Sequence, residues 1–110
     1  MSVDGIWKVE MLGPYGWESM STAFLEDGRY LASSQDHYAV GRYELTGDQI
    51  NVTAATHSHG QARTMFGGKN PHMELSFEGT FSGDQISGQA EDKQEKYSIT
   101  FRAIRLADLP

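Results

Sequence analysis

Gly5-Ile6-Trp7-Lys8-Val9-Glu10-Met11 is the stretch from which the fold can be predicted. Trp7, Val9 and Met11 occupy alternate positions, so in a β-strand their side chains share one face. A tryptophan this close to the start of the chain has to be buried by the segments that follow it. The stretch therefore predicts a first strand with one apolar face, and the rest of the chain must supply the surface that covers it.

Three turn sequences predict where the chain reverses. Asp27-Gly28 offers two residues that tolerate positive φ, and Gly47-Asp48 and Gly83-Asp84 place glycine at the first central position of a tight hairpin turn. With the last two as turns, the apolar residues of each strand pair fall on one face and the polar residues on the other. The predicted apolar-face pairs are Leu45–Ile50, Tyr43–Val52 and Gly41–Ala54 in one hairpin, and Phe81–Ile86, Gly79–Gly88 and Phe77–Ala90 in the other.

The chain as a whole is predicted to be all-β. Consecutive strands with one apolar face each can bury that face and hide their edges by closing into an eight-stranded antiparallel up-and-down β-barrel, with an open sandwich as the alternative. At 110 residues the barrel, residues 1–110, is one domain. The expected strands are Gly5–Met11, Trp17–Leu25, Arg29–Ser34, Tyr38–Leu45, Gln49–Thr56, His72–Phe81, Gln85–Glu91 and Tyr97–Leu106, with longer connections at Leu12–Gly16 and His57–Pro71.

Composition narrows the possible partners and surroundings. Nine Lys and Arg against fifteen Asp and Glu give a net charge of −6, which opposes binding to nucleic acid or to anionic membranes. The chain has no cysteine, which excludes disulfides and thiolate metal sites. The first residues lack a basic segment and a long apolar run, and no stretch approaches the roughly 18 apolar residues of a membrane span, so we expect a cytoplasmic protein.

A Gly-x-Trp opening, a meander of eight strands and an arginine near the end of the last strand resemble the lipocalin and calycin pattern. In that group the tryptophan lies at the closed barrel end and an arginine packs over it. Trp7 matches the tryptophan, and alternation from Tyr97 through Phe101 places Arg105 on the inward face, with Arg102 one step out of phase. Arg105 is therefore the expected partner of Trp7 at the barrel end.

A closer resemblance covers almost the whole chain, from Asp4-Gly5-Ile6 through Tyr38, Gly41 and Gly47-Asp48 to the last strand. The chain resembles the bacterial GrlR-like family, small negative regulators of type III secretion with a lipocalin-like barrel. The resemblance implies a cytoplasmic homodimer that regulates without catalysis by binding a protein partner, such as a transcriptional regulator. Family members that capture an activator carry a run of acidic residues at a hairpin tip, whereas the matching tip here, Thr46-Gly47-Asp48-Gln49, has one acid.

Several clusters of residues contain the residue types of metal, phosphate-binding or catalytic sites, but such residues are also common on ordinary polar surfaces. His57, His59 and His72 are possible ligands for zinc or nickel, but no carboxylate pattern accompanies them, so no metal site is predicted. The glycines and lysine of residues 60–69 lack the spacing of a phosphate loop. Ser33, Ser34, Asp36 and His37 contain the residue types of a nucleophilic triad without any indication of its geometry. We expect no enzyme activity and no cofactor.

Two kinds of binding surface remain. Apolar residues on the outside of the barrel predict a dimer or partner face, for which Met20, Phe24, Leu31 and Ile104 are the candidates. The alternative is a lipocalin-like carrier that binds a small apolar ligand in the barrel interior, between Trp7, Tyr43, Phe77 and Phe81. The small inward residues Gly41, Ala54, Gly79, Gly88 and Ala90 either let the strands bend or leave a cavity, and bending is the favoured explanation.

Overall fold

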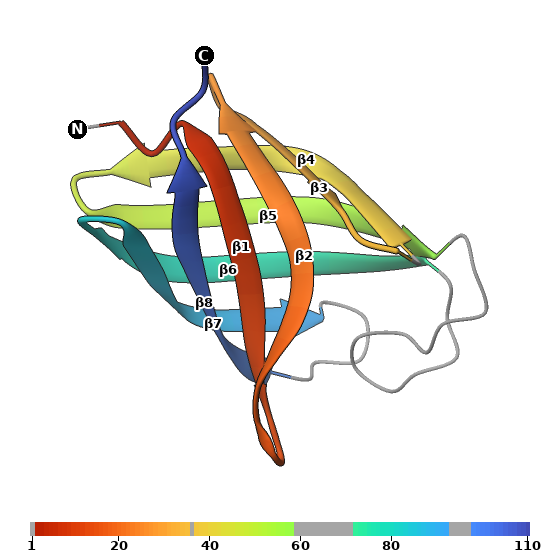
Figure 1. The fold of residues 1–110 in the computed structure, drawn as a ribbon. Coiled ribbons are helices and arrows are strands. Elements are labelled where there is room, and N and C mark those ends of the chain that lie inside the picture. The colour runs from red at the N-terminus through yellow and green to blue at the C-terminus, as the bar shows by residue number, and fades with distance from the viewer. Residues whose placement is uncertain (1, 36, 59–71, 93–97) are drawn as a thin grey trace.

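The computed structural model describes residues 2–35, 37–58, 72–92 and 98–110. Each strand pairs antiparallel with the next, and the last pairs with the first, so the sheet closes into a barrel (Figure 1). This confirms the predicted eight-stranded up-and-down β-barrel. The strands are β1 (Gly5–Gly13), β2 (Gly16–Glu26), β3 (Arg29–Ser33), β4 (His37–Thr46), β5 (Gln49–Ser58), β6 (His72–Ser82), β7 (Gln85–Asp92) and β8 (Ser98–Ala107).

The registers predicted for the two Gly-Asp hairpins are confirmed. Leu45 lies opposite Ile50 in the β4–β5 pair, and Phe81 lies opposite Ile86 in the β6–β7 pair, with the remaining predicted pairs following in register. The prediction of a longer loop at Leu12–Gly16 is wrong. β1 and β2 continue through it to a tight turn at Pro14 and Tyr15, so Leu12 lies in a strand. Residues 59–71 of the other long connection lie outside the described residues.

The core fills the barrel with the inward side chains of all eight strands. Trp7 is only 1% exposed and contacts Val3 near the N-terminus and Arg105 near the C-terminus. Both termini lie at one end of the barrel (Figure 1), which we call the Trp7 end. The other large buried side chains come from strands all around the barrel: Val9, Met11, Leu25, Tyr30, Ile50, Val52, Met73, Leu75, Phe77, Ile86 and Phe101. Among the described residues, no helix is long and apolar enough to cross a membrane.

Two inward glycines stand where strands approach each other too closely for a side chain. A Cβ on Gly88 would lie 1.9 Å from the carbonyl oxygen of Glu78, and one on Gly41 would lie 2.0 Å from the carbonyl oxygen of Thr53. Both obstacles are backbone atoms of the neighbouring strand, so they cannot rotate away. The glycines thus allow strongly coiled strands to close a narrow barrel, as the bending explanation expects.

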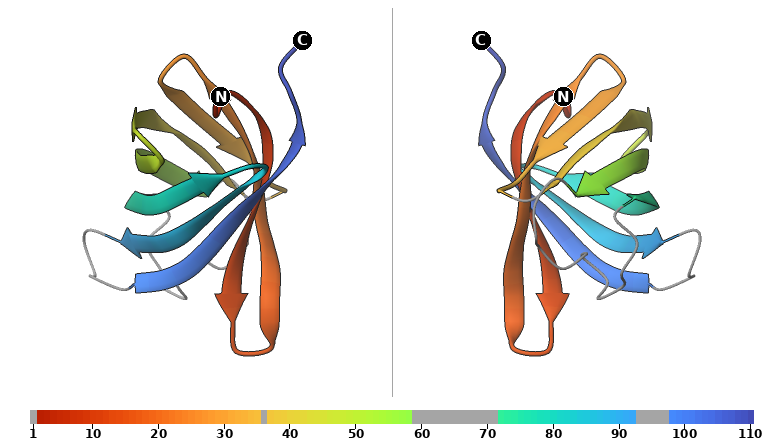
Figure 2. Two further views of the ribbon diagram at one scale, coloured as in Figure 1. Left: turned by 90° about the vertical axis from the view of Figure 1, so that its left-hand side faces the viewer. Right: turned by 90° about the vertical axis from the view of Figure 1, so that its right-hand side faces the viewer.

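The β1–β2 hairpin projects beyond its neighbours, as the red and orange strands of Figure 2 show. The pairing of β1 with β8 ends at Met11–Phe101, and the pairing of β2 with β3 begins only at Thr22–Ser33. Within the hairpin, Val9 lies opposite Ser21 but Glu10 lies opposite Ser19, which makes Met20 an inserted residue, or β-bulge. Between Gly16 and Ser19, β2 pairs with β1 alone among the described residues.

Gly88→Ala should lower the free energy of unfolding by roughly 3 kcal/mol, because the added methyl group must push two backbones apart. Denaturant titration measures the change. Ser87→Ala, at the exposed neighbouring position, is the control and should stay within about 0.5 kcal/mol of the parent. Equal stability of the Gly88→Ala protein would contradict the close backbone approach.

Candidate functional site

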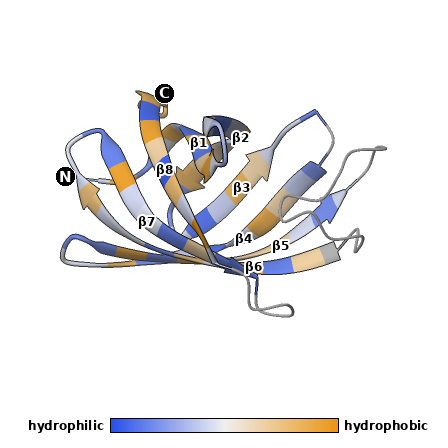
Figure 3. Cartoon of the chain, turned by 90° about the horizontal axis from the view of Figure 1, so that it is seen from below, coloured by the Kyte–Doolittle hydropathy of each residue, from blue (hydrophilic) through white to orange (hydrophobic). Residues whose placement is uncertain are grey.

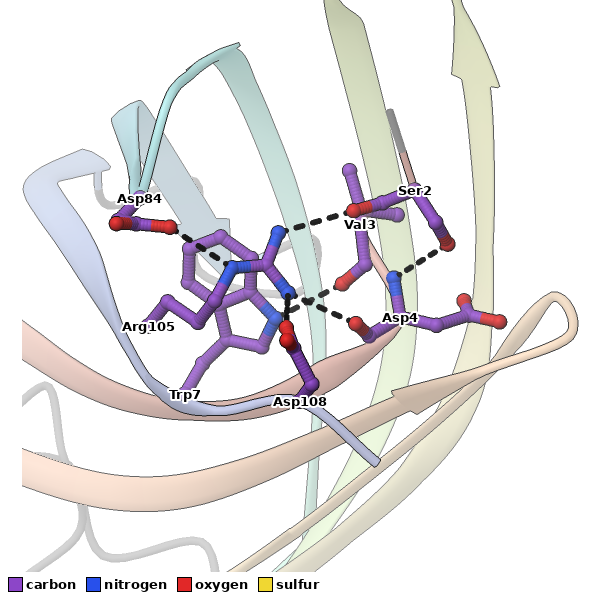
Figure 4. Close-up of polar contacts among 7 residues, drawn as sticks. All are labelled: Ser2, Val3, Asp4, Trp7, Asp84, Arg105 and Asp108. Atoms are coloured by element: carbon purple, nitrogen blue, oxygen red, sulfur yellow. Dashed lines mark hydrogen bonds and ion pairs between the residues drawn. The ribbon is translucent and has the colours of Figure 1, made fainter. Parts of the chain in front are cut away.

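Arg105 joins the first and last strands at the Trp7 end (Figure 4). It lies directly opposite Trp7 in the β1–β8 register, and its guanidinium carbon is 4.5 Å from the centre of the Trp7 ring. The guanidinium donates to the carbonyl oxygens of Ser2 and Asp4 at 2.9 and 2.8 Å and to the Asp84 carboxylate at 3.1 Å. Arg105 thus combines a cation–π contact with hydrogen bonds to two segments, the residues before β1 and the β6–β7 turn.

The residues before β1 lie across the Trp7 end. Val3 is 1% exposed, and its carbonyl oxygen accepts a hydrogen bond from Trp7 Nε1 at 2.9 Å. The carboxylate of Asp4 accepts hydrogen bonds from the Tyr43 hydroxyl and from the backbone N–H of Asp27. Burial, together with the hydrogen bond to Asp4, raises the pKa of Tyr43 above its ordinary value. These contacts give Trp7, Arg105 and Tyr43 structural roles at a closed end.

The barrel interior contains an apolar cavity of about 30 Å³ lined by residues that include Trp7, Tyr30 and Phe77. Of the four residues predicted to bind an interior ligand, Trp7 and Phe77 line this cavity. Tyr43 contacts Asp4 instead, and Phe81 packs edge-on against Trp7 with ring centres 6.1 Å apart. The four side chains therefore do not converge on one space.

A second interior space, further from the Trp7 end, is closely packed. Ser21, His37 and Thr56 border it together with the larger side chains of Tyr30 and Phe77, and no water-sized volume remains between them. Burial raises the pKa of Tyr30, and a hydrogen bond with the neighbouring Ser21 hydroxyl offsets this only partly. Among the described residues, the buried Thr56 hydroxyl oxygen has no hydrogen-bond partner.

An apolar row crosses the outside of the barrel from β1 to β5. The residues of this row are directly opposite one another in the successive strand pairs, and we call it the outer stripe: Ile6, Phe24, Leu31, Val40 and Ala55. Phe24, Leu31 and Val40 are 40%, 44% and 46% exposed. Hydrophobic segments of β3 and β4 are visible in Figure 3. A contiguous exposed row of this kind is typical of an interaction surface.

The four predicted surface residues fall into two groups. Phe24 and Leu31 lie in the outer stripe, next to each other. Met20 instead packs against the core and borders the second interior space, because the bulge at this position breaks the alternation from which it was assigned outward. Ile104 lies opposite Lys8 and Gln85, away from the outer stripe, and is half-buried. Val40, which the sequence reasoning missed, has the outward parity that could have identified it.

A second exposed cluster lies on the outside of the β1–β2 hairpin. Arg102 donates to the Glu10 carboxylate at 2.8 Å, and its guanidinium carbon is 4.1 Å from the centre of the Trp17 ring. Lys8 adds a second ion pair to Glu10 at 3.5 Å. The hydrogen bond from Arg102 is the main cause that lowers the pKa of Glu10 below its ordinary value of 4.5. Trp17 remains 37% exposed beside this arginine.

The residues weighed for metal binding and catalysis are only partly described. His57 stacks on Tyr38, with ring centres 5.1 Å apart, while His59, the glycine-rich residues 60–69 and Asp36 lie outside the described residues. Ser34 Oγ lies 2.7 Å from His37 Nδ1, a contact across the β3–β4 turn. Within the described part of the chain, no group of three or more histidine, aspartate and glutamate residues is arranged to hold a metal ion.

The fold and these surfaces define the chain as a small closed β-barrel with a structural end, a narrow interior and two exposed outer clusters. Neither a comparison with models of known protein families nor a search of curated proteins gives a match. The functional argument therefore rests on the surfaces themselves.

Arg105→Ala should lower the free energy of unfolding by roughly 2–4 kcal/mol, because carbonyl oxygens of the segment before β1 lose charge-assisted donors. Arg105→Lys should recover only part of the loss, since an ammonium group lacks the planar fork and stacks less well on Trp7. Denaturant titration of both variants measures the effect. A full recovery by lysine would show that charge alone accounts for the interaction.

The ion pair of Glu10 predicts a pH dependence of stability. A carboxyl whose pKa is lowered in the folded protein stabilises it above pH 4.5, and this contribution disappears as the pH falls through the folded-state pKa. Glu10→Gln should therefore be less stable than the parent at pH 7, and the difference should shrink below pH 4.5. In an Arg102→Gln background, the stability difference caused by Glu10→Gln should depend less on pH, because the main cause of the lowered pKa has been removed. If the free energies of unfolding of the parent and of Glu10→Gln changed in parallel with pH, the stabilising role of the Glu10 ion pair would be contradicted.

Proposed function

We propose that this chain is a non-catalytic regulatory protein that acts as a cytoplasmic homodimer and binds a protein partner, as the resemblance to GrlR-like negative regulators of type III secretion implies. The observation that supports it best is the outer stripe, where Phe24, Leu31 and Val40 stand in one cross-strand row and are each about two-fifths exposed. A stable interface needs a contiguous apolar centre of this kind.

The surroundings of the outer stripe also suit an interface between proteins. The cross-strand row on the Trp7-end side of the stripe contains Glu26, Arg29 and Arg42, and Glu26 and Arg29 form an exposed ion pair. Interfaces commonly have a polar rim of this type around an apolar centre. A two-fold axis through the stripe would bring the same residues of two copies together, as in most homodimers.

The proposed partner surface differs from the acidic hairpin tip of the family members that capture an activator. Thr46-Gly47-Asp48-Gln49 forms the tight β4–β5 turn, where the Asp48 carbonyl oxygen accepts a hydrogen bond from the Phe81 N–H at 2.7 Å. The single acid of this tip makes it a poor site for a strongly basic partner. The protein partner, which the resemblance suggests is a transcriptional regulator, is therefore proposed to contact other parts of the surface.

The carrier of a small apolar molecule has less support. The apolar cavity of about 30 Å³ is roughly a tenth of the smallest volume that small-molecule pockets usually have. Ligand entry would require the barrel to expand.

Leu31→Lys and Val40→Lys should each weaken the homodimer at least about 30-fold, since a two-fold interface places each charge in the apolar centre twice. Sedimentation equilibrium over micromolar concentrations measures the dissociation constant. Tyr15→Lys introduces the same charge at an exposed aromatic residue of the β1–β2 turn, away from the outer stripe, and should leave the dimer unchanged. A monomeric parent protein, or equal dimer loss in Tyr15→Lys, would contradict the proposal.

A further inference from the structure

The projecting part of β2 has an unpaired edge. β3 contains only five residues and pairs with β2 from Thr22 onward, so the edge of residues 16–21 has no strand beside it within the described part of the chain. β1 covers the opposite side of the same residues. An unpaired edge presents backbone N–H and C=O groups in the arrangement that another extended chain can pair with.

Glu18 lies at the centre of the edge and selects what can pair there. An antiparallel second copy with Trp17 opposite Ser19 would bring the two Glu18 side chains directly opposite each other. Like charges in a direct cross-strand pair are destabilising. This central register therefore disfavours a second copy and favours a strand with a positive charge opposite Glu18.

The side chains along the edge define what such a strand should carry. Glu18 is exposed, and the chain as a whole has a net charge of −6, so both short-range and long-range electrostatics favour Lys or Arg. On the outer face, Trp17 is 37% exposed and Leu12, its partner across the hairpin, is 43% exposed. These two side chains offer an apolar contact to the residues that alternate with the basic ones.

We propose that the β2 edge at Gly16–Ser21 binds an extended segment of a partner protein as an added antiparallel strand, with basic residues toward Glu18 and apolar residues toward Trp17 and Leu12. The proposal rests on the function proposed above, because it names where the protein partner binds. It assigns the partner a surface separate from the outer stripe, so both could be occupied in one complex.

The test uses the full-length protein labelled with ¹⁵N and three capped peptides of about six residues, the usual length of a strand. The first alternates lysine and valine, the second replaces lysine by glutamate, and the third is the lysine peptide with alternate backbone nitrogens methylated. The lysine peptide should shift the amide signals of Gly16–Ser21 in a saturable titration. The other two peptides should bind at least about tenfold more weakly, because they lose the charge match or the backbone hydrogen bonds.

Glu18→Lys should weaken binding of the lysine peptide about tenfold and strengthen binding of the glutamate peptide. Glu78→Lys makes the same charge change at an exposed site on β6 and should alter the binding of neither peptide. The proposal is wrong if no peptide binds at millimolar concentration, if methylation has no effect, or if the shifted amides lie elsewhere. It is also wrong if Glu18→Lys and Glu78→Lys weaken binding equally. Sedimentation of the same samples reports the homodimer separately, so a failure of the outer-stripe dimer is distinguishable from a failure of strand addition.

Discussion

The pairing of the first strand with the last is the constraint on which the rest of the structure depends. Closure places Trp7 and Arg105 opposite each other, and the guanidinium then reaches the carbonyl oxygens of Ser2 and Asp4. The backbone N–H of Arg105 also donates to the Asp84 carbonyl oxygen at 2.8 Å. One residue of β8 therefore connects β1, the residues before it and the β6–β7 turn at the Trp7 end.

Most of the fold could be predicted because its determinants are local. Alternating apolar residues define the strands, and the turns at Gly47-Asp48 and Gly83-Asp84 set the registers of two hairpins without any long-range information. The same alternation places Arg105, and not Arg102, opposite Trp7, as the β1–β8 register does. The Leu12–Gly16 connection was misjudged because Gly13 and Gly16, which usually signal a loop, here end two strands.

The surfaces were harder to predict because they depend on contacts between strands that no turn sequence specifies. Val40 joins the outer stripe only through the β3–β4 register. Met20 was assigned outward by counting, but a one-residue bulge, which sequence alternation does not reveal, turns it toward the core. The Arg102 contact with Trp17 likewise depends on how far the β1–β2 hairpin runs past its neighbours.

The short β3 strand links these features. A β3 as long as β2 would cover the edge at Gly16–Ser21, but β3 ends at Ser33. The barrel closes through the pairs from Thr22–Ser33 to Glu26–Arg29, so this part of the β2–β3 contact is indispensable. Within the described residues, the part of β2 before Thr22 adds nothing to closure on its β3 side. The strand addition that we propose there would therefore leave the barrel intact, because it uses backbone groups that closure does not need.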